Sequence, residues 1–143
     1  MKLIDCFMYF DENLILDIRL NTLKDHVDKF VIVEAKRTHS GNEKKINFKI
    51  ENFPKFKDRI KYFLIDLPLE VESNKKGWHS SHMRDQFQRN ALNKGYENSN
   101  DDDLIMISDI DEIPNPDKFK DFNYMKNKYA CFIQKNFHLK LNL

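Results

Sequence analysis

The chain has few of the residues that interrupt regular structure, since its 143 residues include only three Gly and four Pro. This scarcity excludes a collagen-like repeat, a flexible linker array and a low-complexity disordered segment, which are rich in these residues. The hydrophobic fraction of 41% instead supplies material for a core. A chain of this length can bury about two-thirds of the surface that its unfolded form exposes. We therefore expect one domain over residues 1–143.

Cysteine is almost absent. Cys6 and Cys131 are far apart, and each lies in an apolar run. A disulfide framework needs more cysteines and a zinc site needs closer pairs, so both are excluded. We expect both residues to be buried free thiols in a reducing compartment.

The sequence also lacks long hydrophobic runs and an excess of one charge. Its longest apolar runs have four or five residues, too few to span a membrane. No signal-peptide pattern precedes the first strand-like run. The 24 basic and 23 acidic residues leave a net charge of +1, which creates no general attraction for nucleic acid or an anionic membrane. We expect a cytoplasmic protein with neither a nucleic-acid partner nor a membrane span.

Apolar runs typical of buried strands alternate with segments of helical periodicity. This alternation predicts an α/β fold with a mostly parallel sheet flanked by helices. The expected strands are 3–10, 29–35, 59–65, 104–108 and a long last strand over 129–141, and the expected helices are 14–23, 50–56, 80–96 and 117–125.

The run LIMISDIDEIP at 104–114 is the strongest chemical signal, because an apolar strand leads directly into Asp109, Asp111 and Glu112. Ligands of open α/β sheets bind at the carboxyl ends of strands, and alternate residues of an extended segment face the same side. Two adjacent carboxylates repel each other unless a cation lies between them. Magnesium or manganese, together with nucleotide phosphates, satisfies that need. We expect a divalent metal at Asp109 and Asp111, with Glu112 either a further ligand or a turn residue.

Three kinds of carboxylate site compete for this run. A calcium-binding EF-hand is excluded, because its sixth position requires Gly and its twelfth Glu, where this sequence has Pro114 and Lys120. An Asp-nucleophile phosphatase also places Asp-x-Asp after an apolar strand. That motif normally follows the first strand rather than the fourth and ends in Thr or Val, where Ile113 stands here, so it is the alternative hypothesis. A glycosyltransferase places its Asp-x-Asp after several strands, as here.

Four segments occur in one order along the chain: DCFMYFDE, DKFVIVEAKRTHSG, FQRNAL and SDIDEIP. Together with the closing FHLKLNL, they resemble glycosyltransferase family 17, the family of β-1,4-mannosyl-glycoprotein N-acetylglucosaminyltransferases, over nearly the whole chain. The resemblance implies a GT-A-type, Rossmann-like fold for nucleotide-diphospho-sugars. It also implies a UDP-sugar donor such as UDP-N-acetylglucosamine, a glycan acceptor and inversion at the anomeric carbon.

Members of that family continue well past the length of this chain. We therefore expect a shortened member, or the N-terminal part of a catalytic domain, with the general base outside these residues. A donor-binding remnant without activity is a further hypothesis.

The resemblance also assigns roles to individual residues. It implies that Asp111 binds the metal directly and that Asp109 binds the metal or the donor ribose. Glu34 ends the second expected strand, where GT-A folds commonly place an acidic residue near the nucleoside; a surface acid at a strand end is the alternative.

Three polar residues on the helix before the acidic run are further candidates for donor binding. Arg84 and Gln88 are four residues apart and share a helix face. A guanidinium can donate two parallel hydrogen bonds to a diphosphate, so Arg84 and Arg89 suit that role, with a solvated helix face as the alternative.

The remaining candidates are aromatic and histidine side chains. Trp78 could stack on a sugar or base, or anchor a loop. His138 could face the site as a metal ligand, or be an ordinary strand residue. His79 and His82 have the spacing of a zinc pair, but no third ligand is near them in the sequence.

Overall fold

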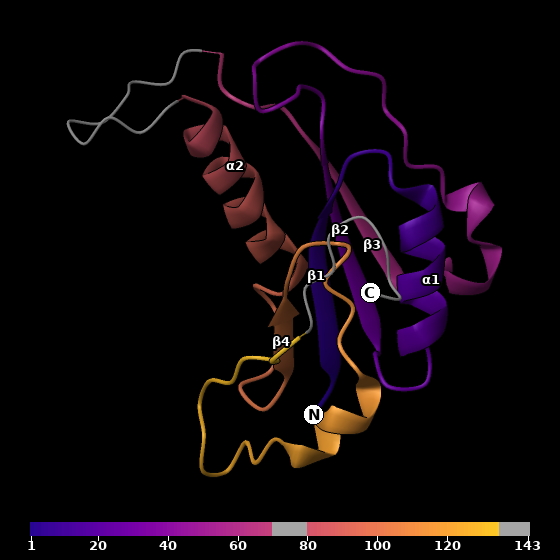
Figure 1. Cartoon of the computed structure of the whole chain (residues 1–143), viewed down its shortest axis with the longest axis vertical. Helices are drawn as coiled ribbons and strands as arrows, with labels where there is room; N and C mark the ends of the chain where they lie inside the picture. The colour runs from indigo at the N-terminus through magenta and orange to yellow at the C-terminus, as the bar shows by residue number, and fades with distance from the viewer. Residues whose placement is uncertain (70–79, 135–143) are drawn as a thin grey trace.

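The computed structural model describes residues 1–69 and 80–134. Its centre is a four-stranded sheet in the order β3-β2-β1-β4, in which every neighbouring pair is parallel (Figure 1). The strands are β1 (Leu3–Tyr9), β2 (Lys29–Ala35), β3 (Ile60–Ile65) and β4 (Leu104–Ile107). The predicted α/β fold with a parallel sheet is thus confirmed.

Helices cover both faces of the sheet (Figure 1). Helix α1 (Asn13–Leu23) connects β1 to β2, whereas α2 (Ser80–Asn90) and the 3-10 helix η3 (Ala91–Gly95) precede β4. Short 3-10 helices η1 (Ile50–Asn52) and η2 (Pro54–Phe56) lie between β2 and β3. In residues 1–69 and 80–134, no helix is both long enough and apolar enough to cross a membrane.

The core on the α1 side is built from the apolar stripe of that helix. Leu16, Leu20 and Leu23 are fully buried and pack with Phe7 and Phe30 of the strands. Their spacing along the chain puts them on one helix face, as the sequence predicted. Residue 19 belongs to the same buried stripe but is an arginine.

A second apolar cluster holds η3 against the other face of the sheet. Ala91 and Leu92 pack there against Cys6 and Val31. The approach is close, because a Cβ at Gly95 would lie 2.9 Å from the Cβ of Val31. Glycine at this position lets the chain pass directly over β2 before it enters β4.

The order of the strands creates a reversal next to β1. The chain moves from β1 to β2 to β3 in one direction across the sheet and then returns to place β4 on the opposite side of β1. The connection from β1 to β2 covers one face of the sheet and the connection from β3 to β4 covers the other. The loops that follow β1 and β4 therefore diverge. In open α/β sheets, such a point is where a crevice for a ligand forms.

Three of the predicted helices differ from the structure. The expected helix 50–56 is two short 3-10 helices, η1 and η2, separated at Phe53. The expected helix 80–96 is an α-helix only as far as Asn90 and continues as η3. The expected helix 117–125 is a 3-10 helix, η4 (Pro116–Asp121), whose first turn is capped by the Asn115 side chain accepting from the Asp117 N–H. The chain leaves η4 in an extended conformation at Phe122, which ends the helix.

The long last strand predicted over 129–141 is wrong for residues 129–134, which form no strand, and its remainder lies outside the described residues. Tyr129 is 82% exposed and Ile133 is fully exposed, so neither packs on the sheet. An apolar pattern forms a strand only where a neighbouring strand supplies hydrogen bonds, and the described residues supply none here.

The two cysteines differ in their surroundings. Cys6 is fully buried on β1, as predicted, but the prediction that Cys131 is buried is wrong because it is exposed. Burial raises the pKa of the Cys6 thiol to about 12, and the charge of the neighbouring Asp5 adds to this effect. The thiolate is the reactive form, so Cys6 is inert at neutral pH.

We predict that a thiol reagent such as Ellman's reagent modifies one cysteine per folded chain at pH 8 and both cysteines in denaturant. Peptide mapping should place the native modification at Cys131. Rapid modification of Cys6 in the folded chain would contradict the burial of β1.

Candidate functional site

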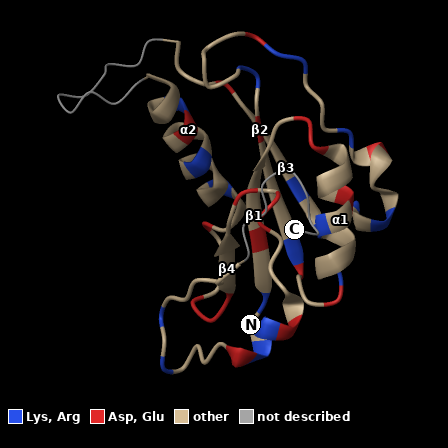
Figure 2. Cartoon of the chain, viewed as in Figure 1, with Lys and Arg blue, Asp and Glu red and all other residues tan. Residues whose placement is uncertain are grey.

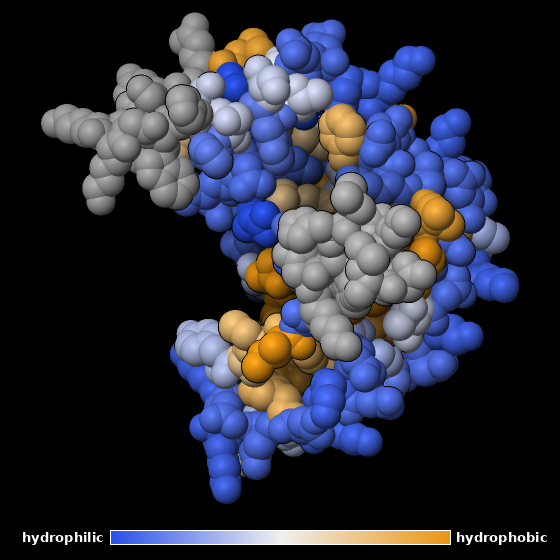
Figure 3. All heavy atoms as spheres, in the orientation of Figure 1, coloured by the Kyte–Doolittle hydropathy of each residue, from blue (hydrophilic) through white to orange (hydrophobic). Residues whose placement is uncertain are grey.

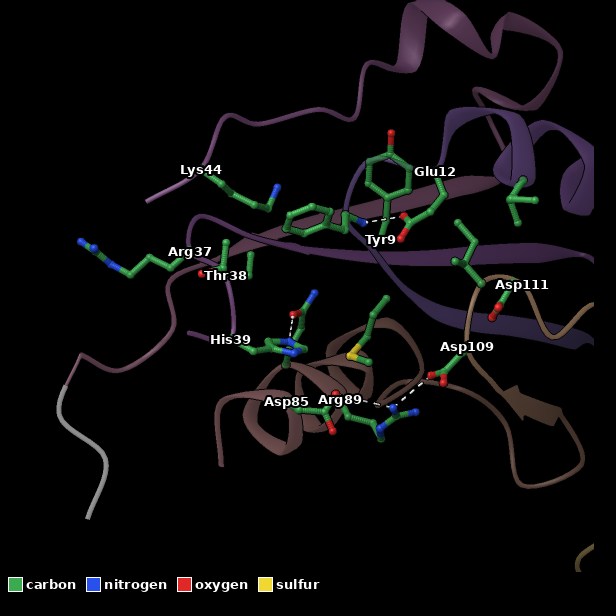
Figure 4. Close-up of a pocket in the computed structure, with 16 residues that line it drawn as sticks. Tyr9, Glu12, Arg37, Thr38, His39, Lys44, Asp85, Arg89, Asp109 and Asp111 are labelled. Atoms are coloured by element: carbon green, nitrogen blue, oxygen red, sulfur yellow. Dashed lines mark hydrogen bonds and ion pairs between the residues drawn. The ribbon is translucent and has the colours of Figure 1, made fainter. Parts of the chain in front are cut away.

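An open cleft of about 530 Å³ lies at the carboxyl ends of β1, β2 and β4, where the strand order reverses. Its lining comes from the loop after β1, the loop after β2, one side of α2 and the turn after β4 (Figure 4). Figure 3 shows that the molecule is hollowed between α2 and the β4 region in this view. The lining residues are Met8, Tyr9, Phe10, Glu12, Ile15, Ala35, Arg37, Thr38, His39, Lys44, Asp85, Gln88, Arg89, Asp109, Ile110 and Asp111.

The turn after β4 presents two carboxylates to this cleft. Asp109 and Asp111 both line it, while Ile110 between them is only 7% exposed and belongs to the core on the α1 side. The apolar middle residue therefore anchors the turn, and its two acidic neighbours face outward. Glu112 does not line the cleft; its Oε2 accepts a hydrogen bond from the Asp109 N–H at 3.1 Å, which makes it a turn residue.

The two carboxylates have different partners. Asp109 Oδ1 lies 3.0 Å from Nη2 of Arg89, and the same nitrogen lies 3.6 Å from Oδ1 of Asp85. The Asp111 side chain forms no hydrogen bond or ion pair with the described part of the chain. Figure 4 shows these side chains together along one wall of the cleft, with Asp111 beyond Asp109.

The donor set fits a hard divalent cation. Carboxylate oxygens are the ligands that magnesium and manganese prefer, and these ions commonly take their other ligands from phosphate and water. Among residues 1–69 and 80–134, no group of three or more His, Cys, Asp and Glu side chains could hold a metal. A metal at Asp109 and Asp111 would therefore need a ligand molecule to complete its coordination.

Beneath the turn lies a buried ion pair that the sequence analysis missed. Arg19 of α1 and Asp5 of β1 are both fully buried. Their contact is bidentate, with Nε donating to Oδ2 at 2.8 Å and Nη2 donating to Oδ1 at 2.7 Å. Burial raises the pKa of the Asp5 carboxyl, and the hydrogen bonds and charge of Arg19 oppose that rise. The Arg19 guanidinium also lies 4.5 Å from the ring centroid of Phe7.

The other donors of Arg19 hold the backbone of the acidic turn. Nη1 donates to the carbonyl oxygens of Asp109 at 2.7 Å, Ile110 at 3.0 Å and Glu112 at 3.4 Å. Nη2 also donates to Oγ of Ser108 at 2.7 Å. One guanidinium thus fixes the main chain of the turn from below, while the carboxylates point away from it.

The three predicted residues of α2 have three different positions. Arg89 lines the cleft and pairs with Asp109, as described above. Gln88 lines the cleft but is 5% exposed, and its Oε1 lies 2.9 Å from Nε2 of His39. Arg84 does not line the cleft. Its guanidinium donates to the carbonyl oxygens of Pro68, His39 and Leu69, so it organises loops.

Glu34 is likewise turned away from the cleft. It is fully buried and accepts hydrogen bonds from Lys44 Nζ, Tyr62 Oη at 2.9 Å, and the backbone N–H groups of Asn47 and Phe48. These bonds fix the long loop between β2 and η1 against the sheet. The structure therefore gives Glu34 a structural place and leaves a direct contact with a nucleoside as a prediction.

Trp78, His79 and His138 lie outside the described residues. The cleft residues that the sequence analysis overlooked include Phe10, His39 and Lys44, all in loops. The Lys44 ammonium lies 4.9 Å from the ring centroid of Phe10, beside the carboxylate of Glu34 that it pairs with. Figure 2 shows that basic and acidic residues are interspersed along most elements, including α2 and its neighbours.

A parallel α/β sheet with a cleft at its strand-order reversal is the arrangement in which open α/β folds bind ligands. The family model for glycosyltransferase family 17 matches residues 1–142, so the chain belongs to that family. Neither the curated proteins nor the solved structures gave a match to this chain. The resemblance seen in the sequence is thus confirmed. The domain is a glycosyltransferase, with a sugar nucleotide and a glycan acceptor as its classes of substrate.

We predict that Arg19→Lys lowers the free energy of unfolding by about 3–5 kcal/mol, because one ammonium cannot replace the fork that satisfies Asp5 and the turn. Chemical denaturation measures the loss. Arg59→Lys is the matched control, since Arg59 also donates to main-chain carbonyls, those of Lys24 and Val27, but has no carboxylate partner among the described residues. The control should lose about 1 kcal/mol. Equal losses in the two variants would contradict the central place of Arg19.

Proposed function

We propose that the cleft binds a divalent metal together with the diphosphate of a UDP-sugar, and that the domain transfers the sugar to a glycan with inversion at the anomeric carbon. The observation that carries this proposal is that Asp109 and Asp111 both line the cleft from a turn at the carboxyl end of β4. Membership of glycosyltransferase family 17 favours this hypothesis over an Asp-nucleophile phosphatase.

In the proposed reaction, a hydroxyl of the acceptor attacks the anomeric carbon of the donor, the bond to the diphosphate breaks, and UDP leaves. A manganese or magnesium ion, when bound, would neutralise the charge that develops on the leaving diphosphate. Asp111 is the ligand best placed to hold it, because its carboxylate has no partner among the described residues. Asp109 forms an ion pair with Arg89, so it would bind either the metal or a hydroxyl of the donor.

The cationic groups at the cleft support a diphosphate as the ligand. Arg89 and Lys44 stand on opposite walls, one on α2 and one on the loop after β2 (Figure 4). A guanidinium and an ammonium both form charge-assisted hydrogen bonds with phosphate oxygens. N-acetylglucosamine as the transferred sugar follows from the resemblance alone. The whole chain, on this proposal, is the donor-binding domain of the transferase.

We predict that UDP with manganese raises the melting temperature of the parent chain, and that Asp111→Asn removes the manganese-dependent part of the rise. A ligand at 100 times its dissociation constant adds about 2.7 kcal/mol of stability, which is several degrees for a domain of this size. Asp102→Asn is the matched control. Asp102 is an exposed carboxylate in the segment before β4; it pairs with the N-terminal ammonium group of the chain and does not line the cleft. It should keep the full shift.

Transfer itself is measured by release of UDP from UDP-N-acetylglucosamine in the presence of glycan acceptors. If Asp111→Asn keeps the same manganese-dependent shift as the parent, Asp111 is not a metal ligand. If no nucleotide or metal changes the melting temperature of the parent, the proposed donor site is wrong.

A further inference from the structure

We propose that His39 is a substrate-binding residue, which presents the lone pair of Nδ1 to a hydroxyl group of the bound sugar nucleotide. The inference rests on the proposed function, since it names a residue that would recognise the donor. His39 lines the cleft from the loop after β2, beside α2, and its side chain is partly buried (Figure 4).

Helix α2 holds His39 by both its backbone and its side chain. Nη1 of Arg84 donates to the His39 carbonyl oxygen at 3.1 Å, and Oε1 of Gln88 lies 2.9 Å from Nε2 of the imidazole. Arg84 and Gln88 are one helical turn apart and therefore lie on the same helix face. Both side chains are almost fully buried, so their orientations are fixed by packing.

The loop around His39 is also a tight turn. The Gly41 N–H donates to the Thr38 carbonyl oxygen at 2.8 Å, and the Thr38 N–H donates to the carbonyl of Asn42 at 2.8 Å. Gly41 has a φ of 95°, which favours glycine, and a Cβ there would lie 3.3 Å from the Arg84 guanidinium. The backbone that carries His39 is thus closed on itself and clamped to α2, which fixes the place of the imidazole at the cleft.

The hydrogen bonds of Gln88 decide which imidazole nitrogen carries the proton. Nε2 of Gln88 donates to the carbonyl oxygen of Val33 at 3.1 Å, and a carbonyl can only accept. The amide NH₂ group therefore faces β2, and Oε1 faces His39. Because Oε1 is an acceptor, Nε2 of His39 must be the protonated nitrogen. In the neutral imidazole, Nδ1 then carries the lone pair.

Nδ1 of His39 has no hydrogen-bond partner in the described part of the chain. A lone pair at the edge of a cleft, on a ring whose tautomer and position are both fixed, is suited to accept a hydrogen bond from a ligand O–H. Sugar nucleotides offer such groups on the ribose and on the transferred sugar. Arg84 and Gln88 together position His39 for the ligand.

Two substitutions at His39 distinguish the roles of the two ring nitrogens. The amide of His39→Asn lies close to the position of Nδ1, whereas the longer amide of His39→Gln reaches toward the position of Nε2 and leaves the Nδ1 position empty. Calorimetric titration with UDP and with UDP-N-acetylglucosamine, each with manganese, is done below the melting temperature of every variant. We expect His39→Gln to bind about tenfold more weakly than the parent, and His39→Asn to stay within about threefold, because one hydrogen bond to the ligand is lost or kept.

The two ligands identify which hydroxyl is recognised. A loss with both UDP and UDP-N-acetylglucosamine places the hydroxyl on the ribose, and a loss with UDP-N-acetylglucosamine alone places it on the sugar; either result supports the proposal. Equal affinity of His39→Gln and the parent would overturn it, and so would an equal loss in both variants, since that is the result of a purely structural role.

The tautomer is tested without any ligand. Nitrogen-15 NMR of the histidine ring in the free chain should show a proton on Nε2 and an unprotonated Nδ1 near neutral pH, and the opposite tautomer would overturn the inference. If the parent binds neither nucleotide, the proposed function fails and this inference fails with it. If the parent binds and His39→Gln binds equally well, only the role of His39 is wrong.

Discussion

The buried ion pair of Asp5 and Arg19 is the interaction on which the rest of the site depends. Burying two charges is expensive, and the expense is offset only where every donor and acceptor is satisfied. Here the guanidinium meets that condition by binding the carboxylate of β1 and the main chain of the turn after β4 at once. One side chain of α1 therefore joins β1 and α1 to the turn after β4, which lies far along the sequence. Arg19 holds the backbone of the turn and not its side chains, so the carboxylates of Asp109 and Asp111 are presented to the cleft.

The same constraint explains why the site forms next to β1. The return of the chain to the far side of β1 puts β4 beside it, in parallel register with Asp5 opposite Met106. Asp5 lies on the α1 face with Phe7, whereas Cys6 between them faces η3. An acidic residue on the α1 face of this central strand can bind Arg19, which also binds the turn after β4. The strand order brings β4 beside β1, and the ion pair then holds the acidic turn that follows β4.

On the opposite wall, a second set of polar side chains fixes the loop after β2. Glu34 binds the far part of this loop, and Arg84 and Gln88 bind the near part around His39. All three are buried, and none of their bonds needs a ligand. The cleft is therefore bounded by backbone that is already ordered on both sides, which limits the entropy lost when a ligand binds.

Much of the fold was predictable from the sequence because strand and helix periodicities are local. The apolar runs of β1, β2 and β4 and the stripe of α1 have the expected places, and the motif after β4 lies at the cleft. Arg19 was missed, although a signal existed: it occupies a buried position of the apolar stripe, and an aspartate interrupts the apolar run of β1. Pairing these opposite charges requires knowing that the two segments are adjacent.

Other features depended on contacts that no local pattern encodes. Glu34 was correctly placed at the end of β2, but the donors that surround it come from residues 44 to 62, which fold back over it. His39 was not predicted at all, because a histidine in a polar loop carries no periodicity. Its significance comes only from the two α2 side chains that hold it.

The central claim is that the metal binds at the turn after β4, and paramagnetic broadening by manganese in the presence of UDP tests it most directly. Manganese broadens the NMR signals of nearby amides, so its position is read from the residues affected. The account predicts loss of the amide signals of residues 109–112 and of the loop after β1, with the signals of residues 101–103 at the other end of β4 retained. Broadening centred on that acidic run instead, with residues 109–112 unaffected, would contradict the account.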